Sequence, residues 1–297
     1  MIKVENLTKR FGEITAADGV SFEVNSGEIL GLLGPNGAGK TTTINMLVGV
    51  QQPDSGKIEL DGVGNPLDKD VRKLIGNAPQ SLAIYEDLTA EENLRFFGRL
   101  YGITGKNLNV RVKWALSFSG LTERKNDKAK TYSGGMKRRL NLACALIHDP
   151  PFLLLDEPTV GVDPQSRNHI FESIEKLHSD GRTIIYTTHY MEEAQRLCDR
   201  VAIIDKGKIL ALDTVNGLLD SYGGLSVINV KLESLPEKPL PVDGNVDGNN
   251  LRIETEKPLE ELAKLSGSGL KFLELSVDRA DLETVFLNLT GRRLRDR

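Results

Sequence analysis

Residues 34–41 constrain the fold more than any other part of the chain. They read Gly-Pro-Asn-Gly-Ala-Gly-Lys-Thr, which fits the phosphate-loop pattern GxxxxGK[ST], and they stand between an apolar strand-like run and a helix-like run. Glycines let successive backbone N–H groups turn toward phosphate oxygens, and the following helix adds the positive end of its dipole. An ordinary glycine-rich turn is the alternative interpretation. A complete motif in its required strand–loop–helix setting favours a nucleotide site.

The side chains of this loop predict how a nucleotide would be held. Lys40 can reach the β- and γ-phosphates of ATP, and the Thr41 hydroxyl can ligand Mg²⁺. We therefore expect ATP and Mg²⁺ as the bound groups. The residues expected to contact the nucleotide are Gly34, Pro35, Asn36, Gly37, Ala38, Gly39, Lys40, Thr41 and Thr42.

A second candidate element is the apolar run 152–155, followed by Asp156 and Glu157. A run without polar residues is typical of a strand buried on both faces. Two acids after a strand, taken alone, more often form a solvated turn. With a phosphate loop upstream, they predict that Asp156 holds Mg²⁺ and that Glu157 polarises the attacking water as general base.

Alternating strand and helix patterns predict the architecture. We expect an α/β fold of the P-loop NTPase type, with a mixed, mainly parallel sheet, a helical subdomain inserted at about residues 89–148, and a small α+β C-terminal extension. A capping box at Thr89–Glu92 opens the helical part. Residues 234–250, rich in Pro, Gly, Asp and Asn, read as a turn or linker. The expected domains are residues 1–222 and 223–297.

Composition limits the classes of function. The net charge is −4, which argues against a dedicated nucleic-acid binder. The two cysteines lie in helix-like runs without a CxxC partner, so we expect buried, reduced thiols. No apolar run approaches the roughly 18 residues that span a bilayer, and no secretory signal is visible. Work at a membrane would therefore require another chain to do the crossing.

Further motifs, in a fixed order, carry a resemblance to a known family. Residues 132–136 read Tyr-Ser-Gly-Gly-Met, which resembles the signature usually written LSGGQ, and they lie about two dozen residues before Asp156. Gln80 matches a Q-loop glutamine, Asp163 ends a D-loop Gly-Val-Asp, and His189 matches a switch histidine. From residue 2 to about 213 the chain resembles ATP-binding-cassette (ABC) ATPases.

The resemblance implies roles for these residues. Ser133, Gly134 and Gly135, with Asp163, would contact the nucleotide bound by a second ABC subunit, in a dimer expected to be formed by two copies of this chain. Gln80 would sense Mg²⁺ and the γ-phosphate, and His189 would hold the γ-phosphate and water. Phe11 stands where the family places an aromatic residue against adenine. Taken alone, His189 and Phe11 would be ordinary surface or packing residues.

The signature departs from the family at Tyr132 and Met136, while its Ser-Gly-Gly core is intact. The basic run 137–139 reads as a solvated helix face, and His148, His169 and His178 as surface residues. Ser133, Gly134 and Gly135 precede a helix expected over residues 136–147, so they would present a second anion-binding helix N-terminus.

The resemblance narrows further to bacterial exporter ATPases, through residues 188–194 and 281–291. It implies an ATPase that powers export of a drug, lipid, polysaccharide or ion through a separate polytopic ABC-2-type permease, at the cytoplasmic face of the membrane, without nucleic acid. The alternative is a soluble ABC ATPase of translation or DNA repair. Residues 81–88, with Ile84 and Tyr85 expected to be exposed, are the candidate permease contact.

Overall fold

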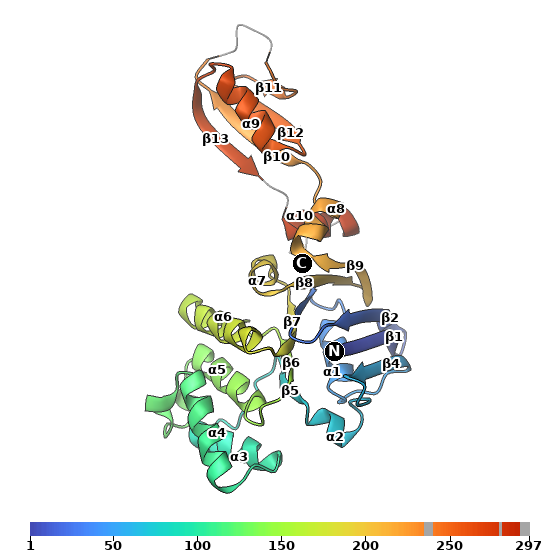
Figure 1. The fold of residues 1–297 in the computed structure, drawn as a ribbon, viewed down its shortest axis with the longest axis vertical. Coiled ribbons are helices and arrows are strands. Elements are labelled where there is room, and N and C mark those ends of the chain that lie inside the picture. Colours follow the sequence, from blue (N-terminus) through green and yellow to red (C-terminus); the bar gives the residue numbers. More distant parts are fainter. Residues whose placement is uncertain (235–239, 279–280, 292–297) are drawn as a thin grey trace. The chain divides into compact units, whose positions relative to one another are not determined.

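The chain, in a computed structural model, forms two compact units, Met1–Thr214 and Val215–Arg297. The structure describes residues 1–234, 240–278 and 281–291 (Figure 1). Among these residues, no helix is long and apolar enough to cross a membrane.

The first unit is organised around a six-stranded sheet in the order β5-β6-β7-β3-β8-β9. All neighbouring strands pair in parallel except β8 and β9, which are antiparallel. Every residue of β3, β6 and β7 is buried, because helices and a second sheet cover both faces. This confirms the expected α/β class with a mixed, mainly parallel sheet. The strands are β3 (Ile29–Leu33), β5 (Ile75–Ala78), β6 (Phe152–Asp156), β7 (Thr183–Thr188), β8 (Arg200–Asp205) and β9 (Lys208–Thr214).

A three-stranded antiparallel sheet in the order β2-β1-β4 shares a hydrophobic core with the central sheet. Its inward side chains, such as Leu7 and Val20, join Leu32, Ile44 and Leu154 in one buried core. The glycine at position 12 has a positive φ of 58°, and it makes the tight turn that returns the chain from β1 to β2. The elements of this layer are β1 (Ile2–Phe11), β2 (Ile14–Val24), β4 (Ser55–Leu60), α1 (Lys40–Leu47) and the short α2 (Lys69–Arg72).

The helical subdomain has a core of its own, in which Leu94, Leu108, Leu116 and Leu140 are each less than 5% exposed. The capping box occurs as expected: the Thr89 hydroxyl accepts from the Glu92 N–H, and the Glu92 carboxylate accepts from the Thr89 N–H. The helices are α3 (Ala90–Leu100), α4 (Gly105–Phe118) and α5 (Gly134–Ala145), with 3-10 turns η1 (Thr122–Arg124) and η2 (Ala129–Thr131).

The expectations for Ile84 and His148 are wrong. Ile84 is partly buried, because it packs on the core of the helical subdomain. His148 is not a surface residue: its ring stacks on Tyr101 at 3.6 Å between centroids, and burial lowers the pKa of His148 to about 4. The imidazole is therefore neutral at pH 7 and packs as an aromatic ring.

The helices α6 (Pro164–Ser179) and α7 (Met191–Leu197) complete the first unit. Asp163 caps α6 and Pro164 is its first residue, as the sequence predicts. Cys144 and Cys198 are buried and free, and burial raises the pKa of both thiols. They are inert packing residues, as expected.

The second unit is a four-stranded antiparallel sheet in the order β11-β12-β10-β13, with α9 packed on it through Leu265. The expected linker 234–250 contains β11, which pairs with β12 as a hairpin; residues 235–239 lie outside the described part. The sequence predicts a last helix from about Ala280, a residue that also lies outside the described part. In the structure this helix begins at Leu282. The elements are α8 (Val215–Tyr222), β10 (Ser226–Leu232), β11 (Asn245–Asp247), β12 (Asn250–Thr255), α9 (Pro258–Gly267), β13 (Phe272–Asp278) and α10 (Leu282–Thr290).

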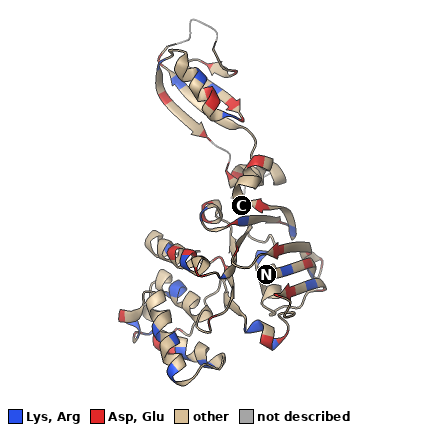
Figure 2. Cartoon of the chain, viewed as in Figure 1, with Lys and Arg blue, Asp and Glu red and all other residues tan. Residues whose placement is uncertain are grey.

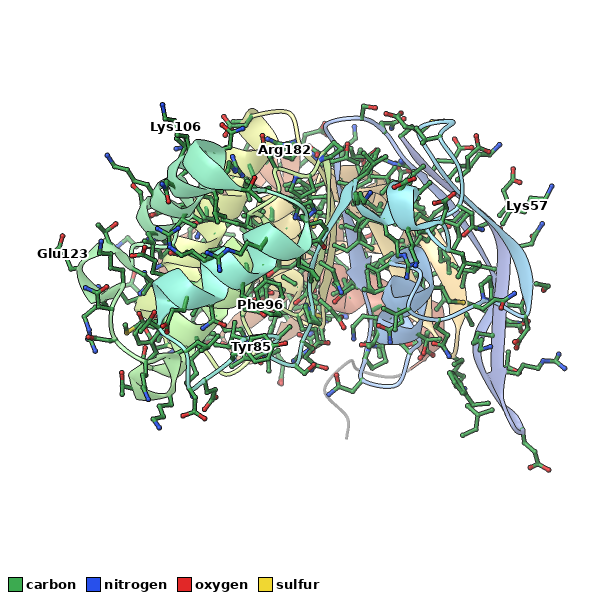
Figure 3. The ribbon with its side chains drawn as sticks, turned by 90° about the horizontal axis from the view of Figure 1, so that it is seen from below. Lys57, Tyr85, Phe96, Lys106, Glu123 and Arg182 are labelled. Carbon is green, nitrogen blue, oxygen red and sulfur yellow. The ribbon has the colours of Figure 1, made fainter. Side chains whose placement is uncertain are left out.

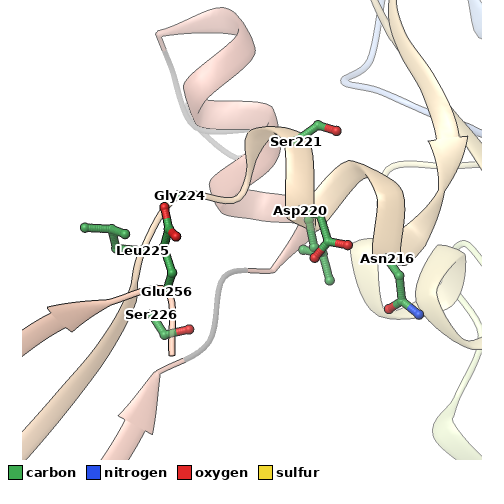
Figure 4. A pocket seen from close by; sticks show the side chains of 8 residues that line it. Asn216, Asp220, Ser221, Gly224, Leu225, Ser226 and Glu256 are labelled. Carbon is green, nitrogen blue, oxygen red and sulfur yellow. The ribbon is translucent and has the colours of Figure 1, made fainter. Parts of the chain in front are cut away.

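The structural division between the units falls after Thr214, whereas the sequence places the domain boundary after residue 222. The difference is α8, which packs on α10 and so belongs with the second unit. A mostly polar pocket lies between α8 and the start of β10, and Asn216, Asp220 and Glu256 are among its lining residues (Figure 4). Acidic and basic residues are both present on the helices and strands of each unit (Figure 2).

Candidate active site

Four neighbouring strands end beside the candidate site. Gln80 follows β5, Glu157 follows β6, His189 follows β7 and Gly34 follows β3, and these strands are adjacent in that order in the sheet. The register of the strands makes them end at nearly the same level, because Leu33 lies opposite Thr188 and Asp156 lies opposite Thr187. The carboxyl ends of parallel strands are the usual place of ligand binding in open α/β sheets.

The phosphate loop borders a cavity of about 380 Å³. The loop cannot accept larger residues at two of its glycines. A Cβ on Gly34 would lie 2.2 Å from the Ile204 carbonyl oxygen, and one on Gly39, whose φ is 103°, would lie 2.2 Å from that of Ala16. The lining residues expected to bind nucleotide or support hydrolysis are Phe11, Asn36, Gly37, Gly39, Lys40, Thr41, Thr42, Gln80 and Glu157.

The remaining residues of the loop hold its shape. The Gly34 N–H donates to the Thr188 carbonyl at 3.3 Å, and the Ala38 N–H donates to the Pro35 carbonyl at 3.2 Å. The Ala38 carbonyl in turn accepts from Gly207. These backbone bonds fix the loop between β7 and the turn after β8.

Lys40 is 4% exposed and folds back over its own loop. Its Nζ donates to the carbonyl oxygens of Gly34 at 2.7 Å and Pro35 at 3.1 Å, and lies 3.1 Å from Glu157 Oε1. A cation so deeply buried requires paired acceptors. Phosphate oxygens of a nucleotide would supply acceptors of the same kind.

Glu157 stands at the centre of the cluster and is 4% exposed. Its Oε2 accepts from the Gln80 amide at 3.1 Å, and its Oε1 lies 3.2 Å from His189 Nδ1. Its backbone is left-handed, with φ 47°, and its N–H donates to the Thr187 hydroxyl at 3.0 Å. A left-handed glutamate is strained, and such strain is typical of functional positions.

Asp156 and Thr41 present a donor set that fits Mg²⁺, which prefers hard oxygen ligands. One oxygen of the Asp156 carboxylate accepts the Thr187 hydroxyl at 2.5 Å, so the carboxylate keeps acceptor capacity for a cation. The Thr41 hydroxyl and the Gln80 amide oxygen are the further oxygens that the sequence assigned to the metal. When bound, Mg²⁺ would neutralise phosphate charge.

His189 Nδ1 is buried and has no hydrogen-bond partner among the described residues, although it lies near Glu157. The ring packs on Tyr190 at 4.1 Å between centroids, and the side chain is 25% exposed. Its other nitrogen is therefore available to a ligand. This geometry suits a residue that contacts a phosphate oxygen.

The signature residues lie at a helix N-terminus and do not line this cavity. The Ser133 hydroxyl accepts from the Met136 N–H at 3.2 Å, as an N-cap. A Cβ on Gly135 would lie 2.1 Å from Ser166 Oγ, so only glycine allows α5 to approach α6 this closely. Ser133 and Gly134 are exposed and are not among the residues that line the chain's own cavity.

The two departures in the signature are explained by packing. The Tyr132 ring is 5% exposed in the core of the helical subdomain, and its hydroxyl donates to the Arg124 carbonyl at 2.6 Å. Met136 packs on the same core. Both side chains fill the subdomain and leave the Ser-Gly-Gly backbone unobstructed.

Asp163 and Phe11 occupy different edges of the unit. Asp163 Oδ1 accepts from the Ser166 N–H at 2.9 Å, and this hydrogen bond lowers the pKa of Asp163. The Phe11 ring, 49% exposed at the end of β1, lies within reach of Lys9 Nζ at 5.9 Å. An exposed ring on the cavity wall suits stacking on a base.

Arg138 was not expected to support the site, because the basic run 137–139 reads in the sequence as a solvated helix face. That expectation is wrong: Arg138 donates to the Gln80 carbonyl and reaches the Val160 carbonyl at 3.5 Å, while Lys137 pairs with Glu86 at 2.7 Å. Arg138 thus links the signature helix to the segments after β5 and β6. Thr187 was also missed, and the only signal was a threonine pair before the histidine.

Comparison with known proteins places this site in a family context. The profile of the ABC transporter family matches residues 17–160. The linearmycin resistance ATP-binding protein of Bacillus subtilis (strain 168) is 44% identical over 312 residues and covers 100% of both chains. Nod factor export ATP-binding protein I of Ralstonia nicotianae is 40% identical over 309 residues, covering 100% of this chain and 95% of the relative.

Solved structures agree with the fold of the first unit. An ATP-binding subunit of an ABC transporter aligns with a TM-score of 0.68 and 29% identity, covering 75% of this chain and 93% of that chain. A dimeric post-hydrolysis ATP-binding cassette bound to ADP and Pi aligns with a TM-score of 0.66 and 28% identity, covering 72% and 98%.

The site predicts that Glu157→Gln lowers kcat for ATP hydrolysis by roughly 10²- to 10⁴-fold, the usual contribution of a general base, while ATP binding is retained. Lys40→Ala should instead lose ATP binding. Steady-state hydrolysis and equilibrium binding of ATP measure the two effects. Glu172→Gln, on the exposed face of α6, is the matched control, and near-normal turnover of Glu157→Gln would refute the general-base role.

Proposed function

The chain belongs to the ABC transporter family as an ATP-hydrolysing subunit, and we propose that it powers export through a separate ABC-2-type membrane permease. The observation that carries this proposal is the full-length similarity to two export-related ATP-binding proteins. It covers the second unit as well as the cassette. A resistance protein and a Nod factor export protein both favour outward transport. The exported molecule is a drug, lipid, polysaccharide or ion.

We propose the following roles for the site residues. The phosphate loop and Lys40 bind the nucleotide, with Phe11 against its base. Thr41, Asp156 and Gln80 would hold Mg²⁺, which neutralises phosphate charge. Glu157 accepts a proton from water as the water attacks the γ-phosphorus, and His189 contacts the γ-phosphate. The cluster of Lys40, Gln80 and His189 around one carboxylate supports this assignment.

We propose that the working ATPase is a dimer of this chain. Ser133 and Gly134 are exposed at the N-terminus of α5 and lie outside their own chain's cavity, so they are free to contact a nucleotide held by another subunit. Asp163, at the N-terminus of α6, is exposed beside them. A related cassette forms a dimer with bound ADP and Pi. Helix N-termini favour anions such as a γ-phosphate.

An exposed aromatic cluster, made of Tyr85 and Phe96, supports a permease contact on the helical subdomain. The two rings meet edge to face at 4.9 Å, and the two side chains are 50% and 41% exposed (Figure 3). Fully buried Asn93 bonds both the N–H and the carbonyl of Tyr85, at 2.8 and 2.9 Å. A rigid, exposed apolar patch is typical of a protein interface.

We propose that the protein works at the cytoplasmic face of the membrane, held there by the permease. The second unit then serves as an accessory domain outside the hydrolytic site. Its own hydrophobic core, with Ile228, Leu251 and Leu265 at 1% exposure or less, supports an independently folded part.

Purification of the Glu157→Gln chain from its native cells, in mild detergent with ATP and Mg²⁺, tests the function. We expect a polytopic membrane protein to copurify in equal amount, because blocked hydrolysis preserves the ATP-bound assembly. The Lys40→Ala chain is the control for ATP dependence. Recovery of ribosomes or DNA-repair proteins instead would support a soluble ABC ATPase and would leave the ATPase assignment intact.

Dimer sharing of the site predicts that Ser133→Arg abolishes turnover but not ATP binding, because the arginine would stand where the partner's phosphate belongs. Mixing this chain with the Lys40→Ala chain should restore activity, since one composite site is then intact. Turnover and ATP binding of each chain and of the mixture are measured. Ser179→Arg, exposed at the end of α6, is the control, and an inactive mixture of dimerised chains would contradict sharing.

The aromatic cluster predicts that Tyr85→Ala combined with Phe96→Ala weakens association with the permease by about tenfold or more, the size expected for interface anchors. The amount of permease copurified per chain measures the change. Tyr222→Ala removes a ring of similar exposure in the second unit and is the control. Unchanged recovery of permease, from a chain with normal thermal unfolding, would refute the assignment.

A further inference from the structure

Glu193, on α7, is a buried carboxylate that the proposed reaction does not use. It is 1% exposed, in a unit where most acids face solvent. Burying a carboxylate costs several kcal/mol unless it is paired and hydrogen-bonded. Its partners and their positions in the chain therefore indicate what it does.

Each oxygen of this carboxylate is bound twice. Oε1 accepts from the Thr159 hydroxyl at 2.7 Å and lies 3.1 Å from Arg167 Nε. Oε2 accepts from the hydroxyls of Tyr186 and Thr188, each at 2.8 Å. Burial, with the Glu193 charge as a second cause, raises the pKa of Tyr186, so that its hydroxyl keeps the proton that it donates.

The oxygens hold two different segments of the active site. Thr159 lies two residues after Glu157, in the turn where the Val160 N–H donates to the Glu157 carbonyl at 3.3 Å. Thr188 immediately precedes His189. Oε1 therefore anchors the segment that carries the general base, and Oε2 anchors the segment that carries the switch histidine.

The Thr188 hydroxyl extends this anchoring around His189. It donates to Glu193 and accepts from the Tyr190 N–H at 2.9 Å. Thr188 and Tyr190, which flank His189 in the sequence, are therefore joined through the Thr188 hydroxyl oxygen. Nothing else among the described residues bonds His189 Nδ1, which lies 3.2 Å from Glu157 Oε1. The backbone, held through Thr188, is what sets the place of the imidazole.

We propose that Glu193 is a positioning residue for hydrolysis: its carboxylate fixes the distance and orientation of His189 relative to Glu157. The inference rests on the proposed roles of those two residues. The simpler view, a satisfied buried acid that only stabilises the core, predicts a different kinetic result. A positioning role affects turnover, whereas ATP binding, which depends on the phosphate loop and Phe11, stays intact.

The test uses the full-length chain and compares Glu193→Ala, Glu193→Gln and Thr188→Val in steady-state ATP hydrolysis. We expect Glu193→Ala to lower kcat by about 10²-fold, because small displacements of catalytic groups have effects of that size. Glu193→Gln should be intermediate, since an amide can still bond the three hydroxyls. KM for ATP should stay within about twofold, as expected when only the chemical step is impaired.

Glu192→Gln is the matched control. Glu192 is the neighbouring residue, its side chain is 79% exposed, and it lies 3.7 Å from the same arginine, Arg167. The Glu192→Gln chain should hydrolyse ATP at the normal rate. In the Thr188→Val chain, the Glu193 carboxylate keeps three of its four partners. This variant therefore provides the decisive measurement if Glu193→Ala does not fold. We expect its kcat to fall by about tenfold with KM unchanged.

A double-variant cycle separates positioning from general stabilisation. In a His189→Ala background, Glu193→Ala should cause a much smaller further loss of kcat, because the histidine that it positions is already absent and only the anchoring of the Glu157 segment is lost. An equal loss in both backgrounds would overturn the proposal, as would normal kcat in Glu193→Ala or Thr188→Val.

The same experiment distinguishes failure of this inference from failure of the proposed function. Normal turnover of both Glu157→Gln and His189→Ala would overturn the assigned roles, and the inference with them. Impaired turnover of those two chains, beside normal turnover of Glu193→Ala, would overturn the inference alone.

Discussion

The parallel pairing of β5, β6, β7 and β3 is the constraint on which the site depends. Leu33 opposite Thr188 and Asp156 opposite Thr187 make these strands end at nearly one level. Residues that are more than a hundred positions apart in sequence thus leave the sheet side by side. A register shift of one residue would turn the buried faces of these strands over and separate the groups.

The charges at the strand ends are matched within the site. Lys40 and Glu157 are both nearly fully buried, and each is the other's ion partner at 3.1 Å. A nucleotide would bring negative charge to Lys40, and the same phosphates would repel the Glu157 carboxylate. Mg²⁺ at Asp156 and Thr41 would offset that repulsion. With the proposed roles, ATP would replace Glu157 as the partner of Lys40, and Gln80 and His189 would remain beside the Glu157 carboxylate.

Most of the fold could be read from the sequence, because its signals are local. The glycine loop, the apolar strand before Asp156 and the caps at Thr89 and Asp163 each act within a few residues, and the structure has them as expected. The strands β9 and β10 went unnoticed. β9 buries only Ala211 and lacks a strong pattern, whereas the alternating apolar residues Ile228, Val230 and Leu232 could have revealed β10.

The parts of the site that the sequence did not reveal depend on long-range partners. Arg138 looks like one cation in a basic run until α5 is placed against the Gln80 carbonyl. In the sequence, Glu192 and Glu193 look like a solvated pair of acids. The packing of α7 on β7 and α6 buries Glu193 and leaves Glu192 exposed. Ile84 was misjudged for the same reason, because its burial is created by a separate hydrophobic core.

The left-handed backbone of Glu157 has an evolutionary consequence. Holding a non-glycine residue in that conformation costs on the order of 1 kcal/mol or more. Glycine at this position would relieve the strain, so the substitution that would remove the proposed general base is also one that the backbone favours. Under selection for folding alone, the glutamate would be replaced over time. Its retention in any descendant of this chain would therefore mark continued dependence on turnover, and copies freed from that demand should lose Glu157 early while keeping their fold.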